Sequence, residues 1–231
     1  MPTTTRHKKL IIAIDGPAGS GKSSTAKALA IKLRLPYVDS GAMYRAVTLK
    51  AMQQGISFHK NFHDNKKLIR IAKSCRIRLT TSPKGAQKVF LDGKNVSEAI
   101  REPALTQNVH YIAQEPLIRR EMVRKQQAMG KKDGAVMEGR DIGTVVFPKA
   151  DYKFYFEAHS DVRAKRRHRD LAGAGMKMPI NRVLEDIKFR DKTDYDRKEG
   201  PLKRAKDAIL IDTSLLTIDQ TVDKILQFIK R

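Results

Sequence analysis

The sequence of 231 residues is 40% hydrophobic and contains one cysteine, Cys75, which predicts one main globular domain and excludes an internal disulfide and a cysteine-based metal cluster. Lysine and arginine (47) outnumber aspartate and glutamate (25), and the net charge of +22 would attract nucleic acids, acidic membranes or nucleoside phosphates, although we assign most of the excess to a well-solvated surface. The first apolar stretch, 10–14, is too short for a membrane span or a secretory signal, so we expect a cytoplasmic protein with no membrane partner.

The first part of the chain shows two strand–helix units. Residues 10–15 are apolar and end at a Gly-Pro pair, and apolar residues at helical spacing follow from 22 to 33. A second short strand is predicted at 37–40, with a helix from 41 to 54 that a glycine closes. Strands that alternate with helices predict a parallel sheet.

The middle of the chain has a different pattern. Residues 76–80 and 88–91 alternate polar with apolar side chains, and the turn sequence 82–85 joins them, which predicts an inserted β-hairpin. Residues 103–129 favour helix, with a break at Pro116 because proline cannot continue a helix without disrupting it.

Strand-like segments return in the last part of the chain, at 135–137, 152–156 and 208–211, and an amphipathic helix is predicted at 218–229. Between them, the segment 160–204 is rich in charge and is interpreted either as a solvated helical pair or as a mobile lid. The pattern as a whole predicts the α/β class, with a parallel sheet covered by helices on both faces.

Residues 16–23 match the phosphate-binding pattern GxxxxGK[ST] and lie between a predicted strand and a predicted helix, as that pattern requires. The phosphate-binding residues predicted here are Gly16, Pro17, Ala18, Gly19, Ser20, Gly21, Lys22, Ser23 and Ser24. Lys22 would contact the β- and γ-phosphates of ATP, and the Ser23 hydroxyl would bind Mg²⁺. Binding of a nucleoside triphosphate is therefore the strongest prediction from the residues themselves.

Arginine is concentrated in the charged segment, where Arg163 and Arg167 are four residues apart and would share one face of a helix. Guanidinium groups bind phosphate oxygens bidentately, and a transfer between two phosphates needs such contacts on both the donor and the acceptor. We favour this interpretation over a solvated charged helix, which the same residues also allow.

Four stretches together resemble the bacterial cytidylate kinases, a family of nucleoside monophosphate kinases, and the resemblance covers nearly the whole chain. The stretches are the loop 16–24, the run DSGAMYR at 39–45, the run GRDIGTVVFP at 139–148, and Arg190-Asp191 with Asp194 and Arg197. As a set they are far more specific than the phosphate-binding loop alone.

The resemblance implies a P-loop NTPase core (1–60 and 130–231), a small β-containing insert that binds the nucleoside monophosphate (about 61–129), and a helical lid (about 160–200). It implies transfer of phosphate from ATP, with Mg²⁺, to CMP and dCMP by a protein expected to be a monomer that binds no specific nucleic acid. The implied catalytic residues are Lys22, Arg140, Arg167 and Arg190, with Arg163 and Arg167 contacting ATP from the lid. The implied acceptor-binding residues are Ser40, Arg45, Arg119, Arg140, Asp141, Arg190, Asp194 and Arg197.

Cytosine chemistry agrees with these roles, because its N4 amine can donate to Asp141 and its N3 and O2 atoms can accept from Arg119. Uracil has a carbonyl at that position and would leave the carboxylate unpaired, so CMP should be preferred over UMP. His110 occupies a position where the family is expected to place a serine that contacts the base. Glu138 matches an acidic residue near the acceptor, or else pairs with an arginine at a strand end.

Two alternative functions are kept open by the sequence. One is a kinase for another small acceptor, such as UMP or a metabolite that is not a nucleotide, against which the base-reading residues Arg119 and Asp141 argue. The other is an ATPase that binds nucleic acid through its charge of +22. The second lacks an obvious set of aromatic side chains on which bases could stack.

Overall fold

A computed structural model describes residues 9–59, 64–82, 85–173 and 175–229. The predicted hairpin turn falls partly on Pro83 and Lys84, which lie outside the described residues, as does Ala174 in the middle of the charged segment. Among the described residues, no helix is long and apolar enough to cross a membrane.

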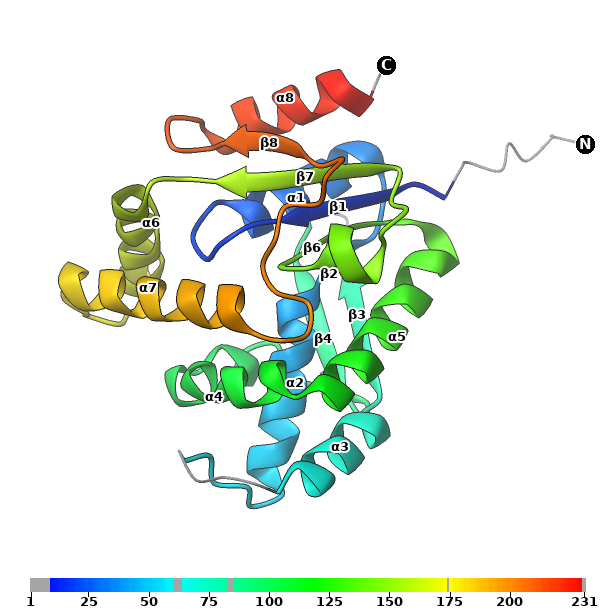
Figure 1. The fold of residues 1–231 in the computed structure, drawn as a ribbon, viewed down its shortest axis with the longest axis vertical. Helices are drawn as coiled ribbons and strands as arrows, with labels where there is room; N and C mark the ends of the chain where they lie inside the picture. Colours follow the sequence, from blue (N-terminus) through cyan, green and yellow to red (C-terminus); the bar gives the residue numbers. More distant parts are fainter. Residues whose placement is uncertain (1–8, 60–63, 83–84, 174, 230–231) are drawn as a thin grey trace, which may run out of the picture.

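A parallel sheet of five strands forms the centre of the molecule (Figure 1). In spatial order its strands are β2 (Tyr37–Asp39), β6 (Ala135–Gly139), β1 (Ile11–Asp15), β7 (Tyr152–Glu157) and β8 (Ile209–Asp212). Every neighbouring pair is parallel, so the carboxyl ends of all five strands meet at one edge. The prediction of a helix-covered parallel sheet is therefore confirmed, with the strand ends within a few residues of their expected positions.

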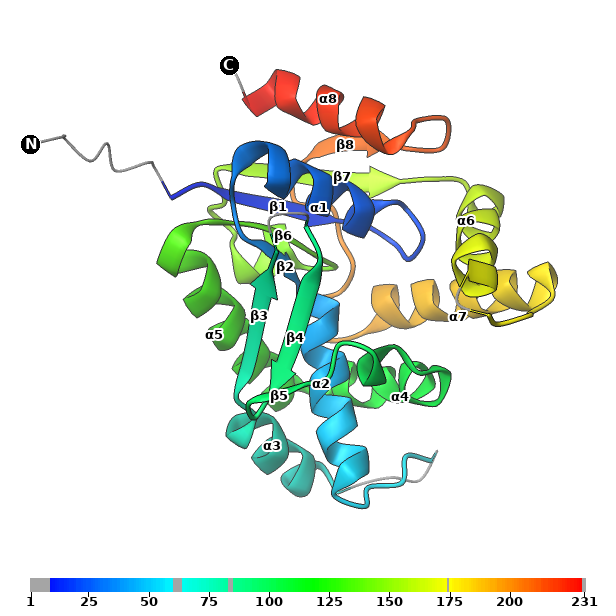
Figure 2. The same cartoon turned by 180° about the vertical axis from the view of Figure 1, so that it is seen from behind.

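Helices cover both faces of the sheet because alternate side chains of each buried strand point to opposite sides. Ile12 and Ile14 of β1 pack towards α1 (Lys22–Leu33) and α8 (Ile218–Ile229) in one apolar cluster. Ala13, between them in sequence, belongs to the cluster on the opposite face. That face is covered by α5 (Pro116–Asp133) and by a short π-helical turn at Ile142–Val146 (Figures 1 and 2).

The predicted hairpin is present as β3 (Ile77–Thr81) and β4 (Gln87–Leu91), and a third short strand, β5 (Lys94–Asn95), completes a separate antiparallel sheet. The amphipathic helix α3 (Asn65–Ser74) precedes the hairpin and was not predicted. Its start is fixed by Asp64, whose side chain accepts a hydrogen bond from the Lys67 N–H at 3.0 Å.

Helices α2 (Ser40–Gln53) and α4 (Pro103–Gln114) share one buried apolar cluster with this small sheet and with α5. A 3₁₀ turn at Ala99–Arg101 leads from β5 into α4. The predicted break at Pro116 is confirmed, since α4 ends at Gln114 and proline occupies the first position of α5, where no donor is needed.

The charged segment forms two helices, α6 (Ser160–Gly173) and α7 (Ile180–Asp196), which pack against each other through a small apolar cluster. Helix α6 begins just after β7 ends, at the carboxyl edge of the sheet, and α7 lies alongside α4 of the insert (Figures 1 and 2). The segment is therefore a pair of helices, which brings Arg163 of α6 to the loop at the strand ends, and its role as a mobile lid stays a prediction.

Candidate active site

The phosphate-binding loop connects β1 to α1 at the carboxyl edge of the sheet. Gly16 has a φ of 148°, and a Cβ atom there would lie 2.4 Å from the Phe156 carbonyl oxygen, so only glycine fits. Gly21 precedes α1 in a left-handed conformation and provides no capping side chain. The first N–H groups of α1 are therefore available to an anion, which the positive end of a helix also favours.

Lys22 is buried at the start of α1, and its ammonium group is folded back onto the loop. Its Nζ donates to the Pro17 carbonyl at 2.7 Å and to the Ser20 hydroxyl at 3.4 Å. Burial and the nearby charge of Arg140 lower the pKa of Lys22 to about 7. The charges of Glu138, Asp194 and Asp15 raise the pKa but do not outweigh burial and Arg140, so the site would favour a bound anion beside the ammonium group.

Ser23 follows Lys22, and its hydroxyl donates a hydrogen bond of 2.5 Å to the Glu138 carboxylate at the end of β6. The Tyr37 hydroxyl donates to the same Oε1 atom at 3.3 Å, and Ser40 donates to the Glu138 backbone carbonyl at 2.8 Å. Burial and the charge of Asp39 raise the pKa of Glu138. This juxtaposition of a hydroxyl and a carboxylate provides the oxygen ligands that suit Mg²⁺, which usually takes its remaining ligands from phosphates and water.

Four guanidinium groups, on Arg45, Arg140, Arg167 and Arg190, lie near one another, and Arg140 also lies near Lys22 of the loop. Burial lowers the pKa of Arg190 to about 10, and the positive charges of Arg167, Arg140 and Arg45 add to this effect. Two of the four have carboxylate partners in the described structure: Arg45 pairs with Asp39 at 2.8 Å, and Arg140 pairs with a residue of the lid. A concentration of cations that repel one another is typical of a site that binds phosphate.

Arg119 of α5 and Asp141, which follows β6, form a buried ion pair, with exposed fractions of 3% and 5%. Arg119 also donates to the Ala113 carbonyl at 3.1 Å, and its guanidinium carbon lies 5.6 Å from the centre of the Tyr44 ring. The backbone of Gly200 lies directly over the pair, since a Cβ atom there would overlap the Asp141 carboxylate. The two residues predicted to read the base are thus brought together from different elements.

Helix α7 reaches this region through Asp194, whose carboxylate accepts a hydrogen bond from Arg140 Nε at 2.6 Å. Arg197, just after α7, lies 3.4 Å from Asp194 and 3.8 Å from Asp141. Its Nη2 atom is buried and has no hydrogen-bond partner among the described residues. The predicted lid residues therefore surround the same space as the predicted acceptor residues of the core.

Arg163 of α6 occupies a different kind of position from that expected of a residue contacting ATP. It donates to the Ala18 carbonyl in the phosphate-binding loop at 3.0 Å, donates to the Ala158 carbonyl at 3.0 Å, and pairs with Asp191 of α7 at 2.7 Å. The guanidinium therefore joins the loop to both lid helices, and its contact with ATP stays a prediction.

His110 lies on α4 at partial exposure, with its Nδ1 atom 2.7 Å from the Gln107 carbonyl oxygen. Its ring packs 4.0 Å from the ring of Tyr111 and 6.1 Å, edge to face, from that of Phe189 on α7. The contact with Phe189 joins the insert to the lid. A role for His110 in reading the base stays a prediction.

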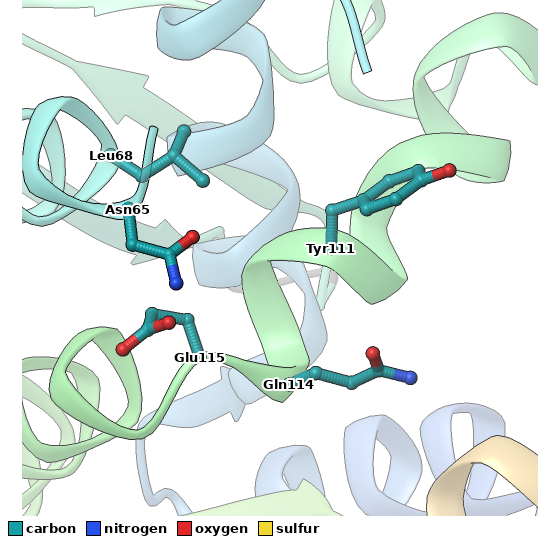
Figure 3. Close-up of a pocket in the computed structure, with 5 residues that line it drawn as sticks. All are labelled: Asn65, Leu68, Tyr111, Gln114 and Glu115. Atoms are coloured by element: carbon teal, nitrogen blue, oxygen red, sulfur yellow. The ribbon is translucent and has the colours of Figure 1, made fainter. Parts of the chain in front are cut away.

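A cavity of about 170 Å³ lies in the insert rather than at the strand ends (Figure 3). It is lined by Asn65, Leu68, Tyr111, Gln114 and Glu115, none of which belongs to the predicted site. The candidate site is instead the polar region between the loop, the insert and the lid.

Asp15 is a buried site residue that the sequence reasoning missed. It ends β1 immediately before Gly16, and its carboxylate accepts hydrogen bonds from the N–H groups of Ile142 and Gly143 at 2.8 and 2.7 Å. An acidic residue at the end of an otherwise apolar strand was the signal that could have marked it. Nothing in the sequence indicated which backbone groups it would meet.

Residues 12–231 match the family model described as cytidylate kinase. A cytidylate kinase of Anoxybacillus flavithermus is 46% identical over 220 residues, covering 95% of this chain and 96% of the relative. One of Bacillus subtilis is 43% identical over 225 residues, covering 97% and 98%. An uncharacterized protein from Eubacterium ventriosum shares the fold, with a TM-score of 0.52, 15% identity, and coverage of 96% of this chain and 98% of that one. The chain therefore belongs to the cytidylate kinase family and is a phosphotransferase that acts on a nucleoside monophosphate.

Proposed function

We propose that the protein transfers the γ-phosphate of ATP to CMP and dCMP in a single in-line step assisted by Mg²⁺. The observation that carries the proposal is the buried Arg119–Asp141 pair, which Arg197 and Asp194 link to Arg140. The Asp141 carboxylate can accept a hydrogen bond from a base, and the Arg119 guanidinium can donate hydrogen bonds to it. The adjacent cations suit the phosphate attached to that base.

The choice of base follows from hydrogen-bonding groups. Asp141 accepts from the N4 amine of cytosine, while Arg119 donates to N3 and O2. Uracil presents a carbonyl oxygen where cytosine presents an N–H donor, so the free oxygen of the Asp141 carboxylate would face a second acceptor, which costs about 1 to 3 kcal/mol. This cost corresponds to a preference for CMP over UMP of about 5- to 150-fold.

In the transfer step, an oxygen of the acceptor phosphate attacks the γ-phosphorus as the bond to the β,γ-bridging oxygen breaks, giving CDP and ADP. The acceptor phosphate is already anionic, so no general base is required. Arg45, Arg140 and Arg190 hold that phosphate, while Lys22 and Arg167 disperse charge on the transferring group. Catalysis is therefore attributed to positioning and to charge stabilisation.

Ser23 and Glu138 are the residues that would hold Mg²⁺, directly or through water. The bound ion would neutralise charge on the β- and γ-phosphates. Ser23 directs its hydroxyl at Glu138, so the two oxygens already face the same space. To bind the ion, the hydroxyl would keep its proton, turn it away from Glu138 and present a lone pair, and the two oxygens would move apart to take up ligand distances.

The lid would exclude water from the reaction, since water would otherwise consume ATP without phosphorylating the acceptor. Support comes from the contacts of α6 and α7 with both halves of the site, through Arg163 to the loop and through Asp194 to Arg140. The proposed division is a core at 1–60 and 130–231, an insert at about 61–129 and a lid at about 160–200.

The test is ADP production from ATP and Mg²⁺ with CMP, dCMP, UMP, AMP or GMP supplied separately. We expect rapid turnover with CMP and dCMP that is lost in Asp141→Ala. Asp223→Asn is the matched control, because Asp223 forms an exposed ion pair with Lys32 far along the chain from the site. Equal turnover with UMP and CMP would reject the base-reading role, and turnover with none of the monophosphates would reject the reaction itself.

A further inference from the structure

Asp15 has no part in the mechanism above, although it is one of the most buried charged residues of the site, with an exposed fraction of 4%. It lies one residue before the phosphate-binding loop, yet its carboxylate points to the neighbouring strand. Strands β1 and β6 are parallel, and Asp15 is in register with Gly139. Its side chain therefore reaches the segment that leaves β6, which carries Arg140 and Asp141.

The groups that Asp15 contacts are the backbone N–H groups of Ile142 and Gly143, the first two residues of the π-helical turn Ile142–Val146. Asp141 precedes this turn and contributes no side-chain cap to it. The carbonyl of Asp141 in turn accepts hydrogen bonds from the N–H groups of Val145 and Val146, at 2.9 and 3.1 Å. The backbone of Asp141 is thus held by the turn, and the turn is held by Asp15.

We propose that Asp15 is a positioning residue whose carboxylate fixes the turn after β6 and thereby aims Asp141 at the base of the acceptor. The proposal rests on the proposed reading of cytosine by Asp141. It gives the strand that carries the ATP-binding loop a second role, in selection of the acceptor.

A carboxylate suits this position better than any neutral side chain of similar size. The two buried N–H groups need two acceptors, and a carboxylate offers an oxygen to each. Asparagine offers one oxygen and one NH₂ group, so one of the N–H groups would face another donor and lose its hydrogen bond.

The test is Asp15→Asn, with initial rates measured over a range of CMP at saturating ATP and over a range of ATP at saturating CMP. We expect the KM for CMP to rise about tenfold, the KM for ATP to stay within about twofold, and the ratio of kcat/KM for CMP to that for UMP to fall. Asp212→Asn is the matched control, because Asp212 ends β8 at the same edge and accepts from the Ser214 N–H at 2.8 Å. The control should change none of these quantities.

If Asp15 acted only through its charge, Asp15→Asn would change the KM for CMP in the opposite direction. Removing a negative charge from this site should favour binding of an anionic nucleotide and lower the KM for CMP. A lower KM for CMP, or equal rises in KM for both substrates, would therefore overturn the proposal.

Two further measurements keep the proposal testable if Asp15→Asn folds poorly or if CMP is not the acceptor. In Gly143→Ala, the added Cβ would lie 3.3 Å from Asp15 Oδ2 and 3.2 Å from Lys153 Cδ, so the turn should shift and raise the KM for CMP in the same selective way. Amide exchange of Ile142 and Gly143, followed by NMR without nucleotide, should be at least about tenfold faster in Asp15→Asn. Unchanged protection of these two amides would overturn the role of Asp15 whatever the acceptor is.

Discussion

Arg140, at the end of the central sheet, donates a hydrogen bond of 2.6 Å to Asp194 on the second lid helix. This contact joins the core to the lid beside the buried Arg119–Asp141 pair. The charges of Arg140 and Arg197 lower the pKa of Asp194 against the opposing effect of burial, which alone would raise it. The carboxylate is therefore ionised at neutral pH and holds two arginines in place.

Asp194→Ala should weaken acceptor binding more than ATP binding, because it leaves Arg140 and Arg197 without their shared carboxylate. Loss of one partner of such a pair costs about 2 to 5 kcal/mol, so kcat/KM for CMP should fall by about thirtyfold or more. Steady-state kinetics with each substrate varied in turn provides the measurement. A fall in kcat/KM for ATP of the same size as that for CMP would contradict the assignment.

Lys22 should take up a proton when ATP binds. Its pKa is lowered to about 7 in the absence of nucleotide, by burial first and by Arg140 second, and phosphates beside it would raise the pKa again. At pH 8, where the terminal phosphate of ATP is ionised, calorimetry in buffers of different ionisation enthalpy should detect uptake of up to about one proton per site. The affinity for ATP should accordingly weaken as pH rises above about 7.

Lys22→Arg is the control for this effect, because a guanidinium stays protonated and takes up no proton. Equal proton uptake by the variant and the wild type would assign the proton to another group.

Arg190→Met should stabilise the protein without nucleotide while lowering its activity. Arg190 is surrounded by other cations, and burial together with their repulsion lowers its pKa to about 10. If removing the charge stabilises the fold by about 1 kcal/mol, the Tm should rise by about 2 to 4 °C. A gain in stability with a loss of activity is expected where a binding site holds residues that destabilise the free protein.

The comparison variant is Arg182→Met on the same helix, because Arg182 forms an exposed ion pair with Glu185. Thermal unfolding is measured with and without inorganic phosphate, which should stabilise the wild type more than Arg190→Met. A lower Tm for Arg190→Met in phosphate-free buffer would refute the cation-repulsion argument.

Arg163 and Asp191 should be coupled energetically through their 2.7 Å ion pair. Arg163→Lys removes the planar guanidinium group that contacts Ala18, Ala158 and Asp191 at the same time. The phosphate-binding loop should therefore become less ordered, and the KM for ATP should rise. A double-mutant cycle with Asp191→Asn, using kcat/KM for ATP, should give a coupling of about 0.5 to 3 kcal/mol. If the free-energy changes of the two single substitutions add up to that of the double variant, the two side chains act independently on ATP use.

The lid should become more ordered when both substrates are bound. Helices α6 and α7 have a small apolar cluster of their own and contact the remainder of the protein mainly through charged side chains. Such elements open at low free energy until a ligand adds contacts. Amide exchange of the lid residues within 160–200 should slow when both nucleotides bind, and unchanged exchange would argue against closure.

The sequence by itself determined the features that depend on neighbours in the chain. The glycines of residues 16–21, the following Lys22 and Ser23, and the apolar run before them specify a strand, a loop and a helix without help from distant residues. Alternating apolar residues likewise predicted the hairpin of the insert. The helix α3 and the strand β5 were missed, because one is a short helix rich in lysine and the other has two residues.

Only the tertiary structure decided which distant groups meet. Asp15 and Gly143 are 128 positions apart, yet parallel pairing of β1 with β6 brings the Asp15 carboxylate to the Gly143 N–H. The packing of α6 beside the phosphate-binding loop likewise sets the Arg163 guanidinium against the backbone carbonyl of Ala18, a contact that the spacing of the arginines did not indicate. A motif records which chemistry a residue can perform. The packing of strands and helices determines which partner it has, because hydrogen bonds and ion pairs depend on distances that the linear sequence does not contain.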